Sequence, residues 1–178
     1  MFRGKKQEEE APKNEIFDVD LEQGIVTRRA DGSRVLVLGS HGWATIENEL
    51  ASTFITGAAV ILQRVGYSYG RAMGRAARRN EVGPDQVFDA MQTLAMESGW
   101  GRFTLNSGDI VGGQARVNVT DCFFCLHARE SAEPVCHVLV GLVGGLVDEI
   151  IGGTHRLTEN KCIAKGDAVC EIVIEKLA

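Results

Sequence analysis

The sequence predicts an α+β fold, in which a block of helices packs on an antiparallel sheet crossed by one buried helix. Three observations predict it. Apolar residues recur at helical spacing through the first half of the chain, whereas short alternating stretches separated by turn residues fill the second half. One stretch of the second half, residues 134–151, is apolar on all sides, as a buried helix is. Helices and strands that are segregated along the chain are typical of α+β proteins.

Length and composition fit one ordinary globular domain. The chain has 178 residues, of which 44% are hydrophobic, and a net charge of -5, which argues against direct nucleic-acid binding. The longest uncharged apolar run, residues 135–147, is shorter than the roughly 20 residues that a membrane-spanning helix needs. The charged N-terminus has no apolar signal core. We therefore expect a cytoplasmic protein with a disordered tail at residues 1–15 and one domain at residues 16–178.

The predicted elements of the first half are a hairpin and three helices. Residues 24–29 and 34–38 read as strands joined by the turn residues 30–33. Ser40 is placed to cap a helix that starts near residue 42. Two apolar stripes at helical spacing predict this helix and a second one; they are Ile46, Leu50 and Phe54, then Ile55, Ala58, Leu62, Val65, Tyr69 and Met73. Residues 83–85 break the second helix and start a third, which ends near Gly99.

The predicted elements of the second half are strands around the buried helix. Asn106-Ser107-Gly108-Asp109 has turn chemistry and predicts a hairpin between strands at 102–105 and from 110 onward. Alternation across residues 115–120 predicts a strand with one wet face. The helix begins at Pro134, and its glycines are best explained by close helix packing, because no phosphate-binding motif is present. Further strands are expected at residues 154–159 and 169–175.

The five cysteines predict metal or redox chemistry, because disulfides are rare in a reducing cytosol. Glu159, Cys162 and Cys170 lie within twelve residues, and a turn at Gly166-Asp167 lets the two thiols face each other. Cys136 lies at a helix N-terminus, which stabilises a thiolate. Three thiolates and one carboxylate would make a closed, structural zinc site. The alternative is that free cysteines fill core positions.

The same residues carry a family resemblance. The C-terminal pattern resembles the 4-vinyl-reductase-type domain, and in particular the sensor half of the phenol- and xylene-responsive transcriptional activators. The matching residues are Glu133-Pro134-Val135-Cys136, Gly141, Gly145, Glu159, Cys162, Gly166-Asp167 and Cys170, and more loosely Arg34-Val35-Leu36-Val37-Leu38, Glu49-Leu50, Arg64-Val65-Gly66-Tyr67 and Gly70. The resemblance implies a structural zinc ion held by Cys136, Glu159, Cys162 and Cys170, and it implies a homodimer.

The chain departs from those sensors at the ligand pocket. The sensors hold the phenol hydroxyl with a His and a Trp, whose positions fall here near Leu94 and Val117, and their pocket tyrosines fall at apolar residues. A pocket at these positions would favour a hydrophobic small molecule. Its residues would be Phe88, Leu94, Met96, Val117, Val140, Leu146 and Leu157. The alternative is that these side chains are the core of a filled domain.

Cys122 and Cys125 form a CxxC whose chemistry depends on local structure. On a loop or turn the two thiols would meet, as a redox pair or a second metal site, with His127 and His137 close enough in sequence to add a ligand. On a continuous strand they would point to opposite faces, which is the interpretation we prefer. The basic end of the second helix, with Arg71, Arg75 and Arg78 among its residues, is interpreted as a solvated face.

The predicted function is that of a stand-alone, zinc-stapled domain that binds or senses a hydrophobic ligand. Its output would pass through the homodimer or a protein partner. Two alternatives come from the wider resemblance: an enzyme or pigment carrier related to tetrapyrrole vinyl reduction, and an acyl-binding interaction scaffold like the trafficking-tether subunits. No Ser/His/Asp set, paired-acid motif or HExxH favours an enzyme.

Overall fold

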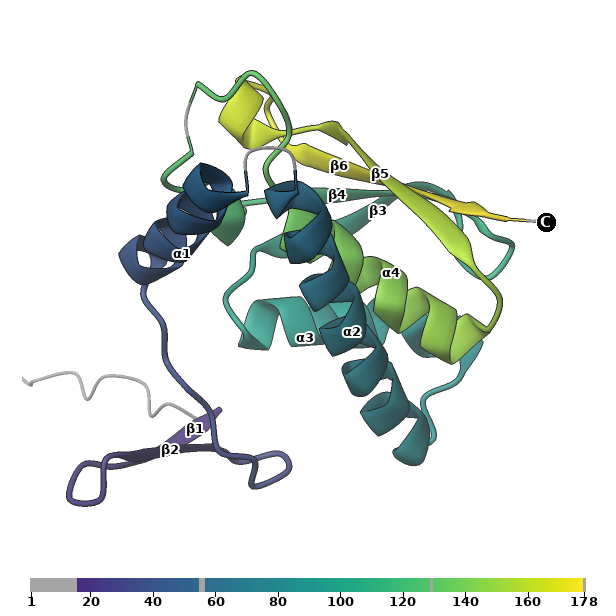
Figure 1. Ribbon diagram of the computed structural model, residues 1–178. Helices are drawn as coiled ribbons and strands as arrows, with labels where there is room; N and C mark the ends of the chain where they lie inside the picture. Colours follow the sequence, from purple (N-terminus) through teal and green to yellow (C-terminus); the bar gives the residue numbers. More distant parts are fainter. Residues whose placement is uncertain (1–15, 55–56, 129, 178) are drawn as a thin grey trace, which may run out of the picture. The chain divides into compact units, whose positions relative to one another are not determined.

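The computed structural model describes residues 16–54, 57–128 and 130–177. The predicted tail at residues 1–15 lies outside this range. The chain divides into two compact units, residues 1–38 and residues 39–178, and each is described by itself. Figure 1 shows the helices and strands of both units in the order of the chain.

The first unit is a small hairpin. Strand β1 (Phe17–Asp20) pairs antiparallel with β2 (Ile25–Arg28), and the Asp20 carboxylate accepts backbone N–H bonds from the turn between them. The predicted strand at 24–29 is therefore confirmed as β2. The predicted strand at 34–38 is wrong, because only an isolated bridge between Arg34 and Thr27 forms there. The Asp20 turn joins β2 to the segment before it instead.

The second unit contains four helices and a sheet, which confirms the predicted α+β class. The helical block is α1 (Ser40–Thr53), α2 (Ala58–Arg79) and α3 (Val87–Glu97), the last preceded by the 3₁₀ turn η1 (Pro84–Gln86). The predicted capping role of Ser40 is wrong. Gly39 is the N-cap residue, and the Ser40 hydroxyl lies 2.8 Å from His127 Nε2 instead.

The sheet is antiparallel throughout, in the order β3-β4-β6-β5. Its strands are β3 (Arg102–Asp109), β4 (Gln114–Thr120), β5 (His155–Lys161) and β6 (Cys170–Lys176). The predicted alternation in β4 and the shared face of Cys170, Ile172 and Ile174 are confirmed by their burial. The predicted turn at residues 106–109 is wrong, because β3 passes through it with a register shift between Leu105 and Ser107, and the chain turns at 110–113.

Helix α4 (His137–Ile151) is the buried crossing helix that the sequence predicts. Residues 138–148 are all buried, and the helix packs against α2, α3 and β5 (Figure 1). It begins at His137, three residues later than predicted, and Pro134 lies outside it. No helix in the described part of the chain is long and apolar enough to cross a membrane.

Glycines let α2 and α4 touch backbone to backbone. A Cβ atom built on Gly66 or Gly70 would lie 2.1 or 2.0 Å from a carbonyl oxygen of α4. A Cβ atom on Gly141 or Gly145 would lie 2.0 or 2.1 Å from a carbonyl oxygen of α2. The four glycines therefore interlock, and the prediction of close helix packing is confirmed.

Candidate metal centre

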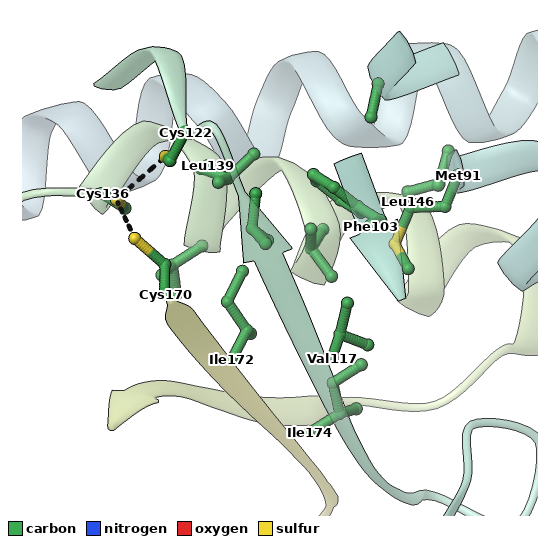
Figure 2. Close-up of a cluster of buried hydrophobic side chains, with 14 of the residues drawn as sticks. Met91, Phe103, Val117, Cys122, Cys136, Leu139, Leu146, Cys170, Ile172 and Ile174 are labelled. Carbon is green, nitrogen blue, oxygen red and sulfur yellow. Dashed lines mark hydrogen bonds between the residues drawn. The ribbon is translucent and has the colours of Figure 1, made fainter. Parts of the chain in front are cut away.

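All five cysteine side chains are buried and converge at one end of the sheet. The Sγ atom of Cys125 lies 3.4 Å from the Sγ atoms of Cys136 and Cys170. It lies 3.6 Å from that of Cys162. The Sγ atom of Cys136 is in turn 3.5 Å from that of Cys122 and 3.7 Å from that of Cys170 (Figure 2). Cysteines that are far apart in the sequence thus form a single sulfur cluster.

Three elements position the sulfur atoms. The short 3₁₀ turn η2 (Phe123–Cys125) supplies the CxxC, and Cys136 is the N-cap residue of α4. Cys162 follows β5 and Cys170 opens β6. The turn between them is fixed by Asp167, whose carboxylate accepts the Cys162 N–H at 2.8 Å. The backbone N–H of Ile163 donates to the Cys170 Sγ at 3.4 Å, which stabilises negative charge on that sulfur.

Glu159 brings a carboxylate to the same place. Its Oε2 accepts the backbone N–H of Cys136 at 3.0 Å. Its Oε1 is buried and has no hydrogen-bond partner within the described residues. Burial raises the pKa of this carboxyl to about 8, because the charged form loses its hydration. An unpartnered oxygen of this kind fits a metal cation, which would compensate the buried charge.

The donor set matches the chemistry of zinc. One ligand atom each from Cys136, Glu159, Cys162 and Cys170 lie within 4.8 Å of one another, which is the set predicted from the sequence. Four ligands at the zinc–sulfur distance of roughly 2.3 Å lie about 3.8 Å apart in a tetrahedron. The observed sulfur separations of 3.4 to 3.7 Å are close to that spacing. These residues fit a closed tetrahedral ion.

The CxxC joins this cluster. Because η2 is a turn, with the Cys125 N–H bonded to the Cys122 carbonyl at 3.1 Å, the two side chains lie on one side of the chain. Their sulfur atoms are within 4.8 Å of each other and of those of Cys136 and Cys170. The preferred interpretation, that a continuous strand points them apart, is wrong. The Ser40 hydroxyl binds His127, and His137 begins α4.

The predicted ligand pocket is largely packed. Five of its seven residues lie in or against one apolar core: Phe88, Val117, Val140, Leu146 and Leu157. Leu94 is half-buried, and Met96 is 58% exposed, so Met96 does not line the interior. Two cavities stand out in the described residues. One, of about 400 Å³, lies between residues 78–84 and 149–152, and one of about 60 Å³ lies between α1 and η2; neither is lined by the seven.

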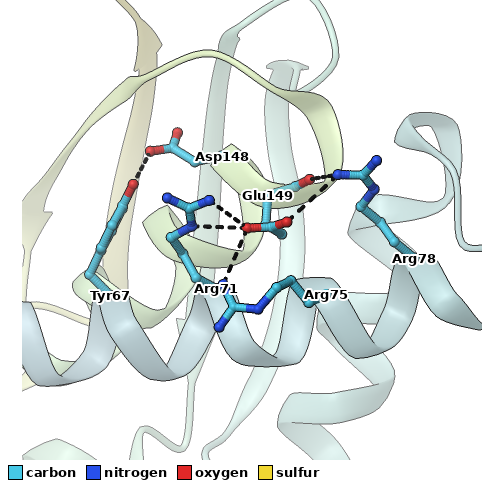
Figure 3. A network of polar contacts seen from close by, with 6 residues as sticks. All are labelled: Tyr67, Arg71, Arg75, Arg78, Asp148 and Glu149. Atoms are coloured by element: carbon cyan, nitrogen blue, oxygen red, sulfur yellow. Dashed lines mark hydrogen bonds and ion pairs between the residues drawn. The ribbon is translucent and has the colours of Figure 1, made fainter.

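A buried polar triad, which the sequence interpretation missed, lies at the other end of α4. Asp148 accepts the Tyr67 hydroxyl at 2.8 Å through Oδ2, and it accepts His155 N and Nδ1 at 2.9 and 2.7 Å through Oδ1 (Figure 3). Since a carboxylate only accepts, Nδ1 carries the proton. His155 Nε2 is buried without a partner among the described residues. A lone acid inside an apolar helix was the available signal.

The basic end of α2 pairs with one acid of α4. Glu149 binds Arg71 at 2.8 Å, and both Arg75 and Arg78 at 3.6 Å (Figure 3). The hydrogen bonds from Arg71 hold the pKa of Glu149 below its usual value. The arginine side chains remain about half exposed, so the predicted solvated face also fastens α2 to α4.

Comparison with known families identifies the C-terminal part of the chain. Residues 115–176 match the family model of the 4-vinyl-reductase-type domain, which confirms the resemblance drawn from the cysteine pattern. An uncharacterized protein of Methanocaldococcus jannaschii is 21% identical over 114 residues, which are 64% of this chain. The matched stretch is 65% of that relative, just under two thirds of its length.

Solved structures share the fold. The phenol-responsive sensory domain of the transcription activator PoxR, solved with phenol, aligns with a TM-score of 0.77 at 19% identity, over 90% of this chain and 85% of that one. A vinyl-4-reductase family protein from Methanocaldococcus jannaschii aligns at 0.61 and 12% identity, over 81% and 85% of the two chains. A trafficking protein particle complex subunit 3 from Naegleria fowleri, covalently bound to palmitic acid, aligns at 0.57 and 10% identity, over 78% and 95%.

Proposed function

We propose, from the premise that residues 115–176 form a 4-vinyl-reductase-type domain, that this protein is a small-molecule sensing module fastened by a structural zinc ion. The observation that carries the proposal is the convergence of Cys136, Glu159, Cys162 and Cys170, with one buried carboxylate oxygen left unpartnered among the described residues. The fold shared with the phenol-responsive domain of PoxR supports the sensing role.

The zinc ion would have a structural role. Four protein ligands fill a tetrahedral zinc ion and leave no position open for water or substrate. The ligands come from the start of α4, from β5 and the turn after it, and from the start of β6, so the ion would join the buried helix to the edge of the sheet. Metal affinity becomes folding free energy when the unfolded chain has no such site.

The ligand in this proposal is a hydrophobic small molecule bound between the helices and the sheet. Supporting this, the residues at the expected positions are apolar and five of them share one core. Entry of a ligand would require these side chains to repack, and the energy of that change would drive the output. The output would pass through a homodimer or a protein partner in the cytoplasm.

Metal analysis of two charge-matched variants tests the zinc site. Protein purified without chelators is expected to carry zinc stoichiometrically, by elemental analysis and native mass spectrometry. Glu159→Gln keeps the shape of the side chain but removes a ligand charge, and it should lose or weaken zinc binding. Glu175→Gln, which changes an exposed acid on β6, should leave zinc unchanged. Wild-type protein that binds no zinc would refute the proposal.

Bound mass tests the ligand. Native mass spectrometry before and after denaturation would release a noncovalent hydrophobic molecule if one co-purifies, and titration with phenols and alkylbenzenes would be followed by tryptophan fluorescence. Saturable binding of one such compound supports the sensor. A covalent acyl chain would favour the interaction scaffold instead, and a bound tetrapyrrole would favour the pigment carrier.

A further inference from the structure

We propose that the cysteine cluster holds two divalent metal ions, bridged by the thiolates of Cys136 and Cys170. The first ion is the one of the proposed function, on which this inference rests, with Glu159 and Cys162 as its terminal ligands. The second ion takes Cys122 and Cys125 as terminal ligands. The ligand chemistry is that of a soft, tetrahedral cation such as zinc, with every position filled by the protein.

The number and arrangement of donors carry the inference. Six side chains converge, two more than one tetrahedral ion can use. They form two groups of four, Cys122, Cys125, Cys136 and Cys170, and Cys136, Glu159, Cys162 and Cys170, each with its ligand atoms within 4.8 Å. The groups share two members, and two tetrahedra that share an edge describe a dinuclear centre with two bridging ligands. The shared sulfur atoms are 3.7 Å apart, near the tetrahedral edge of about 3.8 Å.

The CxxC is arranged as a chelating pair. A C-x₂-C spacing on a tight turn is typical of zinc sites, because it directs two sulfur atoms to one ion. Here the turn η2 places Cys122 and Cys125 at 3.5 and 3.4 Å from the Cys136 sulfur, and both side chains are only 2% exposed. The CxxC therefore faces the shared ligand and not the solvent.

The two shared cysteines are the ones that the backbone prepares for negative charge. Cys136 is the N-cap residue of a 15-residue helix, where unpaired N–H groups and the helix dipole favour a thiolate. Cys170 receives the Ile163 N–H. A bridging thiolate binds two cations, so these are the positions where extra negative charge is most useful.

Charge balance favours two ions when all six groups are ionised. Five thiolates and one carboxylate carry six negative charges, of which one divalent ion offsets two and two ions offset four. In a site with one ion, Cys122 and Cys125 must stay protonated beside the thiolate ligands. Binding of the second ion releases those two protons, so the thiol of each becomes a metal–sulfur bond.

Metal counting and cadmium NMR test the inference. Protein purified anaerobically with a phosphine reductant and excess zinc is expected to hold two ions per chain by native mass spectrometry. The double variant Cys122→Ser/Cys125→Ser should hold one. Asp121→Asn, which changes the exposed acid beside the CxxC but no donor, should hold two. Wild-type protein loaded with ¹¹³Cd should give two resonances split by cadmium–cadmium coupling through the bridging sulfur atoms, a result that does not depend on any variant folding.

The other outcomes separate the two proposals. One ion per chain in wild-type protein, unchanged in the double variant, would overturn the dinuclear centre and leave the single zinc site intact. No ion would overturn both. A disulfide between Cys122 and Cys125 in the reduced preparation, detected as the loss of two hydrogens in the intact mass, would also overturn the inference and assign the CxxC as a redox pair.

Discussion

Replacing Gly145 with alanine tests whether α2 and α4 must touch backbone to backbone. The new Cβ atom would lie 2.1 Å from the Tyr67 carbonyl oxygen and 2.8 Å from the Arg71 nitrogen. Even close carbon–oxygen contacts between helices are about 3.3 Å, so the helices must part by roughly 1 Å. Both neighbours are backbone atoms and cannot rotate away. The other interlocking glycines lose their contacts when the helices separate.

The expected cost is large for a single methyl group. Overpacking of a core costs about 1–3 kcal/mol and occasionally more, and the shared interface puts this site at the upper end, about 3 kcal/mol. Alanine also gains about 1 kcal/mol of helix propensity over glycine, which offsets part of the clash. For a chain of this size, a net loss of about 2–3 kcal/mol lowers Tm by about 4–12 °C.

The neighbouring residue provides the matched control. A Cβ atom on Gly144 would meet the Leu157 Cδ1 at 3.3 Å, which is the end of a flexible side chain. Gly144→Ala should therefore change stability by less than about 1 kcal/mol, with helix propensity in its favour. Urea and thermal unfolding followed by circular dichroism would compare both variants at equal metal load. If Gly145→Ala unfolds together with wild type, or if the two variants lose stability equally, the backbone contact is wrong.

Four further outcomes follow from the same structure. A strong chelator, or Cys162→Ser, should lower Tm, because metal binding is coupled to folding; an unchanged Tm would mean that the cluster adds no stability. Burial raises the pKa of Glu47 to about 7 from an unfolded value of 4.5, so its contribution to stability is present at low pH and is lost as pH rises through about 7. Glu47→Gln should therefore stabilise at pH 8 by about 1–2 kcal/mol, after allowing for its solvated part, and little at pH 4; equal effects at both pH values would contradict this. The pKa of Glu149 is lowered, so the stability it contributes is present at neutral pH and is lost as pH falls through its folded pKa; Glu149→Gln should destabilise at pH 7, less in high salt, and not in acid. Tyr67→Phe should cost about 1–2 kcal/mol in urea unfolding, because it removes a hydrogen bond to the buried Asp148 carboxylate, and no loss would place that hydroxyl in water.

Elements with an unambiguous hydrophobic pattern were predictable. The apolar run of α4 and the alternation in β4 have one favourable burial each, and both were predicted with small errors at their ends. The segment 106–109 was not, because the same residues suit a turn or a bulged strand. Pairing with β4, which is far from local in its energetics, decided for the strand.

Local chemistry misled the interpretation at Ser40 and at residues 34–38 for a related reason. Serine is a good N-cap, but its hydroxyl serves His127, a residue 87 positions later. Residues 34–38 are apolar and β-branched in part, yet Leu36 is 88% exposed because β2 already pairs with β1. Propensity describes what a segment can do, and competition between partners decides what it does.

The sequence by itself determined the chemistry of the candidate site. Three cysteines and a glutamate at the spacing of Cys136, Glu159, Cys162 and Cys170 are soft and acidic donors around a turn and a helix start, and these properties are local. Only the tertiary structure decided that the CxxC turns toward the same point, and that Tyr67, Asp148 and His155 meet at the far end of α4. A ligand set is defined by distances between atoms, and distances between distant residues arise only when the helices and the sheet pack.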